Sequence, residues 1–426
     1  MEEKRRKRIN FLQNISIALL TLSAVVLFAH TQFYNLGKDL GGSLSFLGPN
    51  PSASSAIVTQ PSKLSAPLRI TVSDTYGRYG TISMTTTNEE FAPLDSLLKA
   101  TLGSSRPYVS CSGADYLKAL SSTSVYYDFL SPLPLSVIAS FFGITLEDNL
   151  PVRTFVISDT GSTSVTLYLW DGSTGYYRAD TAATHNDLTE TVSRYELGSA
   201  DLAMDLASEN SHYAEIHPCS LFLRELPQLP ELSATVPAQM TDRLLLALDF
   251  NPNTKYRSIE ASGAELIVEN DRSLRVQPNG GVHYLSGSAS VLTIECESGI
   301  PTLQEAASQG GAFLMDLMSP FIGDVAIYLQ EIYQSDETIV LRFGYHANGV
   351  PLRFADGSYA AEMTLIGTVI TSLDLNIRQY TASGANTSLL PLQQALAIAA
   401  KQENVELSVG YVDKGSNSVN SAWLAD

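Results

Sequence analysis

Few residues in this chain have the types and the spacing that catalysis requires. Ser96-x-x-Lys99 fits the pattern in which a lysine activates a serine nucleophile, as in penicillin-binding enzymes. The Ser-Asp-Asn and Lys-Thr-Gly motifs that complete such sites do not occur, and no Gly-x-Ser-x-Gly elbow is present. Because Ser96 lies beside the apolar stripe of an expected helix, we interpret it as an ordinary helical surface residue.

A second group that could do chemistry is His212, His217 and Cys219, which could in principle bind a metal ion. A spacing of five does not place both histidines on one helical face, and Pro218 interrupts any regular element. We therefore interpret them as incidental loop residues. The sequence also contains no Cys-x-x-Cys pair, no calcium loop and no glycine-rich phosphate loop, so we predict no catalytic residues, no metal site and no cofactor.

Carboxylates recur every four residues at Asp201, Asp205 and Glu209. This spacing predicts the solvated side of an amphipathic helix over residues 199–208 rather than a carboxylate site. His346 falls on the polar face of an alternating strand, and we expect it to be solvated. Carboxylate pairs can still assemble from distant positions, so an extracytoplasmic hydrolase remains one alternative.

Three cysteines, Cys111, Cys219 and Cys296, are far apart in the sequence. Because their number is odd, at least one stays free unless it pairs with another molecule. A chain of this length does not need disulfide bonds for stability, so we expect buried thiols.

The distribution of charge excludes one class of function. The chain has 426 residues and a formal charge of −18, while its first eight residues carry +3, which leaves −21 for the rest. So acidic a body does not attract nucleic acid or an anionic membrane surface.

The N-terminus predicts the location of the protein. No Asp, Glu, Lys or Arg occurs between Arg8 and Lys38, and the apolar stretch from Ile9 to Phe33 is long enough to cross a bilayer. The basic residues before it orient the N-terminus toward the cytoplasm. A cleaved signal peptide is the competing interpretation, but no convincing Ala-x-Ala site follows Ala29. We predict an uncleaved single-pass anchor, with the bulk of the chain outside the cell membrane.

Small residues within this span could let it pack against other membrane helices, because close backbone approach drives helix association in lipid. These candidates are Ser16, Ala18, Thr21, Ser23 and Ala24.

We expect an α+β fold in which antiparallel sheets are flanked by helices. Residues 1–36 form the basic tail and anchor, and the Gly-, Ser- and Pro-rich residues 37–66 form a flexible stalk. Three α+β domains then follow over residues 67–198, 199–297 and 298–426.

The patterns behind this division are strands and helices with ordinary boundary signals. Strands are predicted at 68–72, 125–130, 152–158, 164–170, near Tyr176, and at 264–269, 274–276, 282–285, 291–295, 359–366, 368–375 and 406–412. Helices are predicted after the capping box Thr87-x-x-Glu90, from Pro134, at 243–248, at 302–318 and from near Leu390. Turns are predicted at Asn279-Gly280, Asn348-Gly349 and Asp356-Gly357, and the chain ends in a polar tail.

Three sets of segments together resemble a known protein family. They are Thr123–Leu130 with Pro132 and Pro134; Phe250–Pro252 with Ile267–Val276, Gly281 and Tyr284; and Phe343–Pro351 with Gly410–Tyr411 and Ala422–Trp423. Together with the membrane span they resemble the YycH family of Firmicutes, and the third set is similar also to the sister family YycI. Glu269-Asn270-Asp271 stands where the family has a Tyr-Thr-Asp-Gly-type turn, and Ser421 stands where it has a proline.

The resemblance implies a protein that is not an enzyme. YycH proteins are anchored extracytoplasmic regulators of the sensor histidine kinase in the two-component system called WalK–WalR or YycG–YycF, which controls cell-wall metabolism. The expected partners are that kinase and a YycI-like membrane protein, with contacts through the membrane helices. The alternative is a module that binds a ligand or polymer of the cell envelope and has no kinase partner.

Overall fold

A computed structural model describes residues 64, 67–83, 91–161, 163–253, 256–287, 292–296, 299–402 and 405–425. The expected membrane span, its packing candidates (Ser16, Ala18, Thr21, Ser23 and Ala24) and the capping box Thr87-x-x-Glu90 lie outside these residues. No helix within the described ranges is both long enough and apolar enough to cross a bilayer. One compact unit covers residues 57–426.

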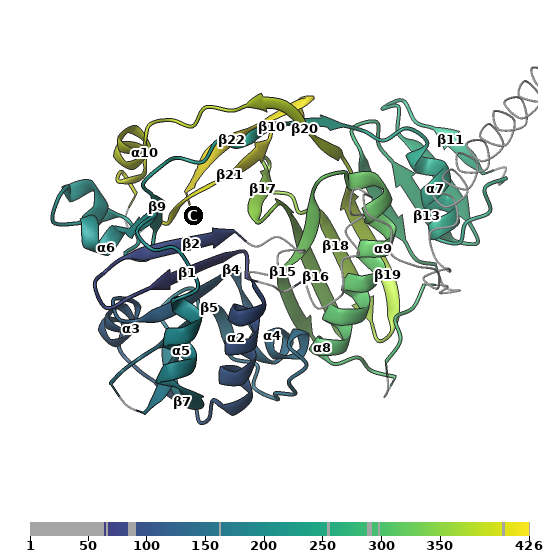
Figure 1. Cartoon of the computed structure of the whole chain (residues 1–426). Coiled ribbons are helices and arrows are strands. Elements are labelled where there is room, and N and C mark those ends of the chain that lie inside the picture. Colours follow the sequence, from purple (N-terminus) through teal and green to yellow (C-terminus); the bar gives the residue numbers. More distant parts are fainter. Residues whose placement is uncertain are drawn as a thin grey trace, which may run out of the picture. The chain divides into compact units, whose positions relative to one another are not determined.

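The fold is α+β, as predicted, and its described strands form two sheets (Figure 1). The first sheet has nine strands in the order β3-β7-β6-β5-β4-β1-β2-β8-β9, and each described pair is antiparallel. Its strands are β1 (Arg69–Ser73), β2 (Tyr79–Ser83), β3 (Val109–Ser110), β4 (Ser124–Pro134), β5 (Pro151–Ser158), β6 (Ser164–Trp170), β7 (Tyr176–Thr184), β8 (Ala200–Leu202) and β9 (Leu221–Leu223).

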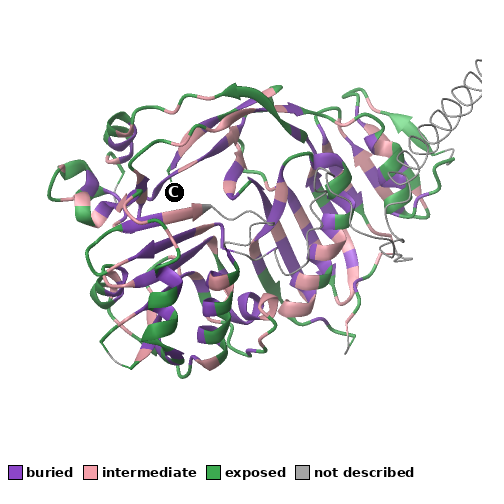
Figure 2. Ribbon diagram, viewed as in Figure 1, coloured by how far each residue is buried: buried purple, intermediate pink, exposed green. Residues whose placement is uncertain are grey.

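Helices cover both faces of this sheet, so alternate residues of its central strands enter two different cores. They are α2 (Ala92–Ser104), α3 (Gly113–Leu120), α4 (Leu135–Phe141) and α5 (His185–Val192). Val125 and Tyr127 of β4 pack with the apolar stripe of α2, while Tyr126 packs with Tyr116 of α3. The predicted strands and helices of this region are confirmed, and Figure 2 shows the buried inner faces of its helices.

The second sheet has thirteen strands, twelve of them in the order β11-β12-β13-β14-β19-β18-β16-β17-β21-β22-β10-β20, with β15 paired to β16. Only β17 and β21 run parallel among its described pairs. Its strands are β10 (Pro230–Thr235), β11 (Arg257–Ile259), β12 (Glu265–Glu269), β13 (Arg272–Val276), β14 (Gly281–Leu285), β15 (Ala326–Ser335), β16 (Thr338–Ala347), β17 (Val350–Phe354), β18 (Ala361–Ile366), β19 (Val369–Asn376), β20 (Gln379–Asn386), β21 (Leu407–Asp413) and β22 (Ser418–Ala425).

The remaining helical segments are α6 (Ala203–Leu206), η3 (Ser211–Glu215), α7 (Met240–Ala247), α8 (Leu303–Glu305), η4 (Ala306–Gly310), α9 (Gly311–Ile322) and α10 (Leu392–Ala399). The predicted helix at 302–318 is observed as the continuous run α8–η4–α9, and a capping box of Thr302 and Glu305 begins it. The run contains a π-helical turn where Gly310 approaches β16 and β18. A Cβ on Gly310 would lie 2.7 Å from Cδ1 of Leu341, so a larger residue there would require the Leu341 side chain to shift.

The first sheet crosses the expected domain boundary near residue 198, and the second sheet crosses the one near residue 298. Strands β8 and β9 extend the first sheet beyond residue 198, and β10 to β14 belong to the same sheet as β15 to β22. Residues 199–297 therefore contribute strands to two sheets and have no separate sheet of their own among the described residues. Leu64, assigned to the flexible stalk, is fully buried, and its carbonyl accepts a hydrogen bond from the Leu329 N–H.

Three predicted elements were wrong. Residues 199–208 do not form one helix, because β8 pairs with β2 and β9 before the short α6 begins. The strand expected at 291–295 is reduced, within its described residues, to a single bridge from Thr293 to Val369. The polar tail is strand β22, since pairing with β21 and β10 satisfies its backbone groups.

Candidate functional site

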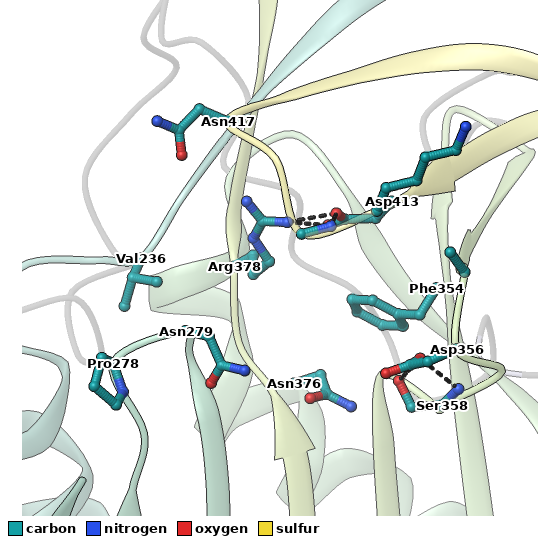
Figure 3. Close-up of a pocket in the computed structure, with 13 residues that line it drawn as sticks. Val236, Pro278, Asn279, Phe354, Asp356, Ser358, Asn376, Arg378, Asp413 and Asn417 are labelled. Atoms are coloured by element: carbon teal, nitrogen blue, oxygen red, sulfur yellow. Dashed lines mark hydrogen bonds and ion pairs between the residues drawn. The ribbon is translucent and has the colours of Figure 1, made fainter. Parts of the chain in front are cut away.

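A polar pocket forms where three turns of the second sheet converge (Figure 3). The turns are Asn279-Gly280 between β13 and β14, residues 355–358 after β17, and residues 414–417 between β21 and β22. The cavity measures about 380 Å³, within the range of small-molecule sites. We call it the turn pocket.

The floor of the turn pocket is a buried ion pair between Arg378 and Asp413. Arg378 Nη1 lies 2.6 Å from Asp413 Oδ2, and its Nη2 donates to the carbonyls of Ala234 (3.0 Å) and Ser416 (2.6 Å). The Tyr380 hydroxyl donates to Asp413 Oδ2 at 2.7 Å. Burial, followed by the neighbouring Tyr345 and Asp413, raises the pKa of Tyr380, which stays protonated. Both Nη groups of Arg378 and both carboxylate oxygens of Asp413 are therefore bonded within the protein, and the pair holds the surrounding loops together.

Glycine is required in the first of the three turns. Gly280 has φ +96°, and a Cβ there would lie 2.1 Å from the carbonyl oxygen of Ile377. In return, the Ile377 N–H donates to the Gly280 carbonyl at 2.9 Å. The predicted Asn279-Gly280 hairpin is confirmed, and this contact fixes its tip against the link between β19 and β20.

The rim of the turn pocket carries polar groups that the protein uses only in part. Asp356 Oδ1 accepts from the hydroxyl (2.7 Å) and the N–H (3.0 Å) of Ser358, and these bonds lower the pKa of Asp356. Asn279 Oδ1 accepts from the Gly281 N–H at 3.1 Å. The Asn279 side-chain amide N–H groups and the side chains of Lys414 and Asn417 have no hydrogen-bond partner within the described residues. The rim thus offers both donors and acceptors to a ligand.

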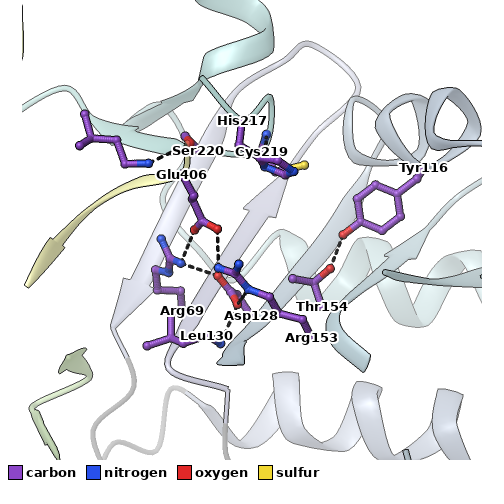
Figure 4. Close-up of polar contacts among 11 residues, drawn as sticks. Arg69, Tyr116, Asp128, Leu130, Arg153, Thr154, His217, Cys219, Ser220 and Glu406 are labelled. Atoms are coloured by element: carbon purple, nitrogen blue, oxygen red, sulfur yellow. Dashed lines mark hydrogen bonds and ion pairs between the residues drawn. The ribbon is translucent and has the colours of Figure 1, made fainter. Parts of the chain in front are cut away.

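A second polar cluster joins the first sheet to the segment that precedes β21 (Figure 4). Arg69 of β1 contacts both Asp128 of β4 and Glu406, and Arg153 of β5 contacts the same two carboxylates. The four side chains form a closed ring of alternating charge. We call it the charge ring.

The charge ring is balanced and buried. Asp128 is fully buried and Glu406 is 5% exposed. Burial alone would raise the pKa of Asp128, but the guanidinium groups of Arg69 and Arg153 outweigh it and lower that pKa. Asp128 is therefore ionised near neutral pH and is a poor proton donor. The ring suits a structural connection better than acid–base catalysis.

His217 and Cys219 lie beside the charge ring rather than in a metal site. The His217 ring stacks on Trp170 with 4.7 Å between centroids, and its Nδ1 accepts from the Cys219 N–H at 3.3 Å. Burial lowers the pKa of His217 and raises that of the Cys219 thiol. His212 is exposed, and the described residues contain no group of three or more His, Cys, Asp or Glu side chains placed to bind a metal.

The other residues considered from the sequence are accounted for by their surroundings. Ser96 is exposed on α2, and its hydroxyl donates to the Ala92 carbonyl at 2.8 Å. Asp201 is in β8 and pairs with Arg224. All three cysteines are free; Cys219 is buried, as expected, whereas the other two are half-buried.

The prediction that His346 is solvated was wrong. It is 8% exposed, lies near the Tyr328 ring, and accepts a hydrogen bond from the Gly349 N–H at its Nδ1. The second face of β16 is covered as well as the first, so its polar position is buried too. Burial lowers the pKa of His346 to about 4.

Sequence reasoning missed Arg378, Asp413 and the charge ring. One signal was available: Asp128 lies within Val-Tyr-Tyr-Asp-Phe and Arg153 within Val-Arg-Thr-Phe, which are charges inside otherwise apolar strands. Such residues are seldom buried unless they are paired. The identity of the partner, Glu406, has no local signature.

The architecture and its sites define an α+β protein with two extended sheets. Comparison of the chain with protein-family models, with curated proteins and with solved structures finds no match in any of the three.

Proposed function

We propose that this chain is a membrane-anchored extracytoplasmic regulatory protein. By associating with a sensor histidine kinase, it modulates a two-component system that controls cell-wall metabolism. The observation that carries the proposal is the resemblance of its ordered segments to the YycH family. Most of those segments lie in β4, in β12 to β14, in β16–β17 and in β21–β22, while Phe250–Pro252 lies in the connection between α7 and β11. The resemblance therefore involves strands of both sheets and one connecting segment.

The proposed partners are a WalK/YycG-like kinase and a YycI-like membrane protein, with a lipid bilayer crossed by one helix. The proposed contact surface is the small-residue face of that helix: Ser16, Ala18, Thr21, Ser23 and Ala24.

The test exchanges residues 1–33 for an unrelated membrane anchor of equal length. The chimera keeps the protein tethered but removes the proposed packing surface. We expect the native chain to co-purify with the kinase from non-denaturing detergent and the chimera to lose most of that association and of its effect on kinase activity. A chimera that binds and regulates as well as the native chain would place the contact outside the membrane. If the native chain fails to retain the kinase at all, the regulatory function is refuted.

The second candidate function is a module that binds a ligand or polymer of the cell envelope. The turn pocket favours it, because three turns held by a rigid sheet surround a cavity with partly unused polar groups. Retention of the full chain on isolated cell-wall polymer, lost when Asp356 is replaced by alanine, would support this function.

A further inference from the structure

We propose that the turn pocket binds an uncharged saccharide of one or two rings. This inference rests on the second candidate function, ligand binding, and it holds whether or not the protein has a kinase partner. Four features of the turn pocket support a saccharide: its charge balance, its hydrogen-bonding groups, its aromatic wall and its rigidity.

Charge balance excludes a strongly charged ligand. Asp413 and two backbone carbonyls occupy both Nη groups of Arg378 at the floor, so these groups are not available to a phosphate or a carboxylate. At the rim, the positive Lys414 is balanced by the negative Asp356. A charged ligand would lose hydration on entry without gaining a surplus of opposite charge.

The rim matches groups that both donate and accept hydrogen bonds. Asn279 presents unused amide donors, Asn417 presents a whole side-chain amide, and Asp356 presents a carboxylate oxygen, Oδ2, that Ser358 does not use. A hydroxyl group donates one hydrogen bond and accepts others, so adjacent ring hydroxyls can satisfy amides and a carboxylate together. Few other uncharged small molecules carry such groups at this density.

One wall of the turn pocket is apolar. Phe354 is half-buried at the end of β17 and lies 6.1 Å from the ring of Tyr345, which is fully buried. Figure 3 shows the Phe354 ring beside Asp356 and Ser358. A sugar ring has one face of C–H groups, and such a face packs on an aromatic side chain while its hydroxyls reach polar neighbours.

The turns are fixed in place before any ligand binds. In the first turn, the Gly280 carbonyl accepts a hydrogen bond from the Ile377 N–H at 2.9 Å. In the other two turns, the Ala355 N–H donates to the Asp413 carbonyl at 2.8 Å, and the Gly415 N–H donates to Asp413 Oδ1 at 2.7 Å. Each turn therefore has a backbone anchor near the buried ion pair. A preformed site avoids the entropic cost of ordering loops, which otherwise reduces the affinity of small ligands.

The experiment uses the full chain purified in a polyoxyethylene detergent, because a maltoside head group would itself compete for the pocket. Saturation-transfer NMR and calorimetry measure binding of maltose and of N,N′-diacetylchitobiose, with inorganic phosphate and glucuronate as charged comparators. We expect at least one neutral disaccharide to bind with a Kd of about 1 mM or tighter. Asp356→Asn and Asn279→Ala should each weaken that binding by about tenfold, while Asp336→Asn, an exposed aspartate of the β15–β16 turn, should leave it unchanged.

Thermal unfolding of each variant separates loss of the site from loss of the fold, and Phe354→Leu supplies a further variant if Asn279→Ala is unstable. Absence of neutral-saccharide binding at millimolar concentration overturns the inference, and so does binding that all the pocket variants retain. Binding of phosphate or glucuronate alone, lost in Asp356→Asn or Asn279→Ala, would overturn the ligand class while leaving ligand binding as a function. Co-purification of the kinase is measured on the same preparations, so its failure is distinguished from failure of the saccharide site.

Discussion

Replacing Glu406 with glutamine removes one negative charge from the charge ring while keeping the size of the side chain. Each carboxylate oxygen of Glu406 accepts from a different arginine, Oε1 from Arg69 and Oε2 from Arg153. After the substitution, Asp128 alone faces two guanidinium groups, and the ring carries an uncompensated positive charge. Glutamine also turns an amide N–H₂ toward one of the arginines, where only an acceptor fits.

The magnitude follows from burial. Glu406 is 5% exposed and Asp128 is fully buried, so solvent screens the lost attraction poorly. Removing one partner of a buried ion pair costs about 3–5 kcal/mol, because the remaining charge stays desolvated. A matched control is Glu190→Gln, which breaks the exposed pair between Glu190 of α5 and Arg194 just beyond that helix, whose side chains are 71% and 54% exposed. Exposed pairs of this kind contribute less than about 1 kcal/mol.

Urea unfolding followed by tryptophan fluorescence measures the difference. The chain has two tryptophans, and Trp170 lies against the Arg153 guanidinium at 5.4 Å from its ring centroid. A Trp423→Phe background leaves Trp170 as the single reporter beside the charge ring. If Glu406→Gln lowered the free energy of unfolding no more than Glu190→Gln does, the charge ring would not connect the two parts of the fold as argued.

Two further substitutions test the burial of His346 and the close approach of Gly280. The unfolded chain protonates His346 near its usual pKa of about 6.5, whereas burial lowers the folded value to about 4, so its contribution to stability is lost as pH falls between these values. From about pH 7.5 to about pH 5 the loss is about 2 kcal/mol, and His346→Asn should remove that part of the pH dependence of urea unfolding. Gly280→Ala should lower the free energy of unfolding by about 2–4 kcal/mol, because the left-handed φ and the contact with Ile377 both penalise a Cβ.

Each of these substitutions has a control. His212 is exposed, so His212→Asn is the matched control for loss of a histidine, and an equal effect of both histidine variants would contradict the burial argument. Gly357 also has a positive φ, of +78°, but open space around its Cβ position. Gly357→Ala should therefore lower the free energy of unfolding by only about 1–2 kcal/mol. If both glycine variants lowered it equally, the contact with Ile377 would relax without penalty.

The parts of the fold that the sequence predicted are those with local causes. The apolar run Val125–Leu130 and the turn at Asn279-Gly280 need only neighbouring residues, and both the strand and the turn are observed. Strand β8 could not be predicted in the same way, because Ala200–Leu202 becomes a strand only through pairing with distant partners. His346 was predicted to be exposed although it is buried, because alternation of polar and apolar residues does not show whether a second layer covers the polar face of a strand.

In the candidate sites, too, local patterns predicted single residues but not how these residues come together. Asn279 and Asp356 were found as turn residues, but nothing in their spacing places them around one cavity with Lys414. Their meeting depends on the order of strands in the sheet, with β14 beside β19 and β17 beside β21.

The charge ring also constrains the order in which the chain can finish folding. Arg69 and Glu406 are 337 positions apart in the sequence. A chain is made from its N-terminus, so β1, β4 and β5 are complete long before residue 406 exists. Until then, two arginines share the single carboxylate of Asp128, and closing so long a loop is entropically unfavourable. The first sheet therefore reaches its full stability only when nearly the whole chain has been synthesised, and the last strands complete the fold of the first.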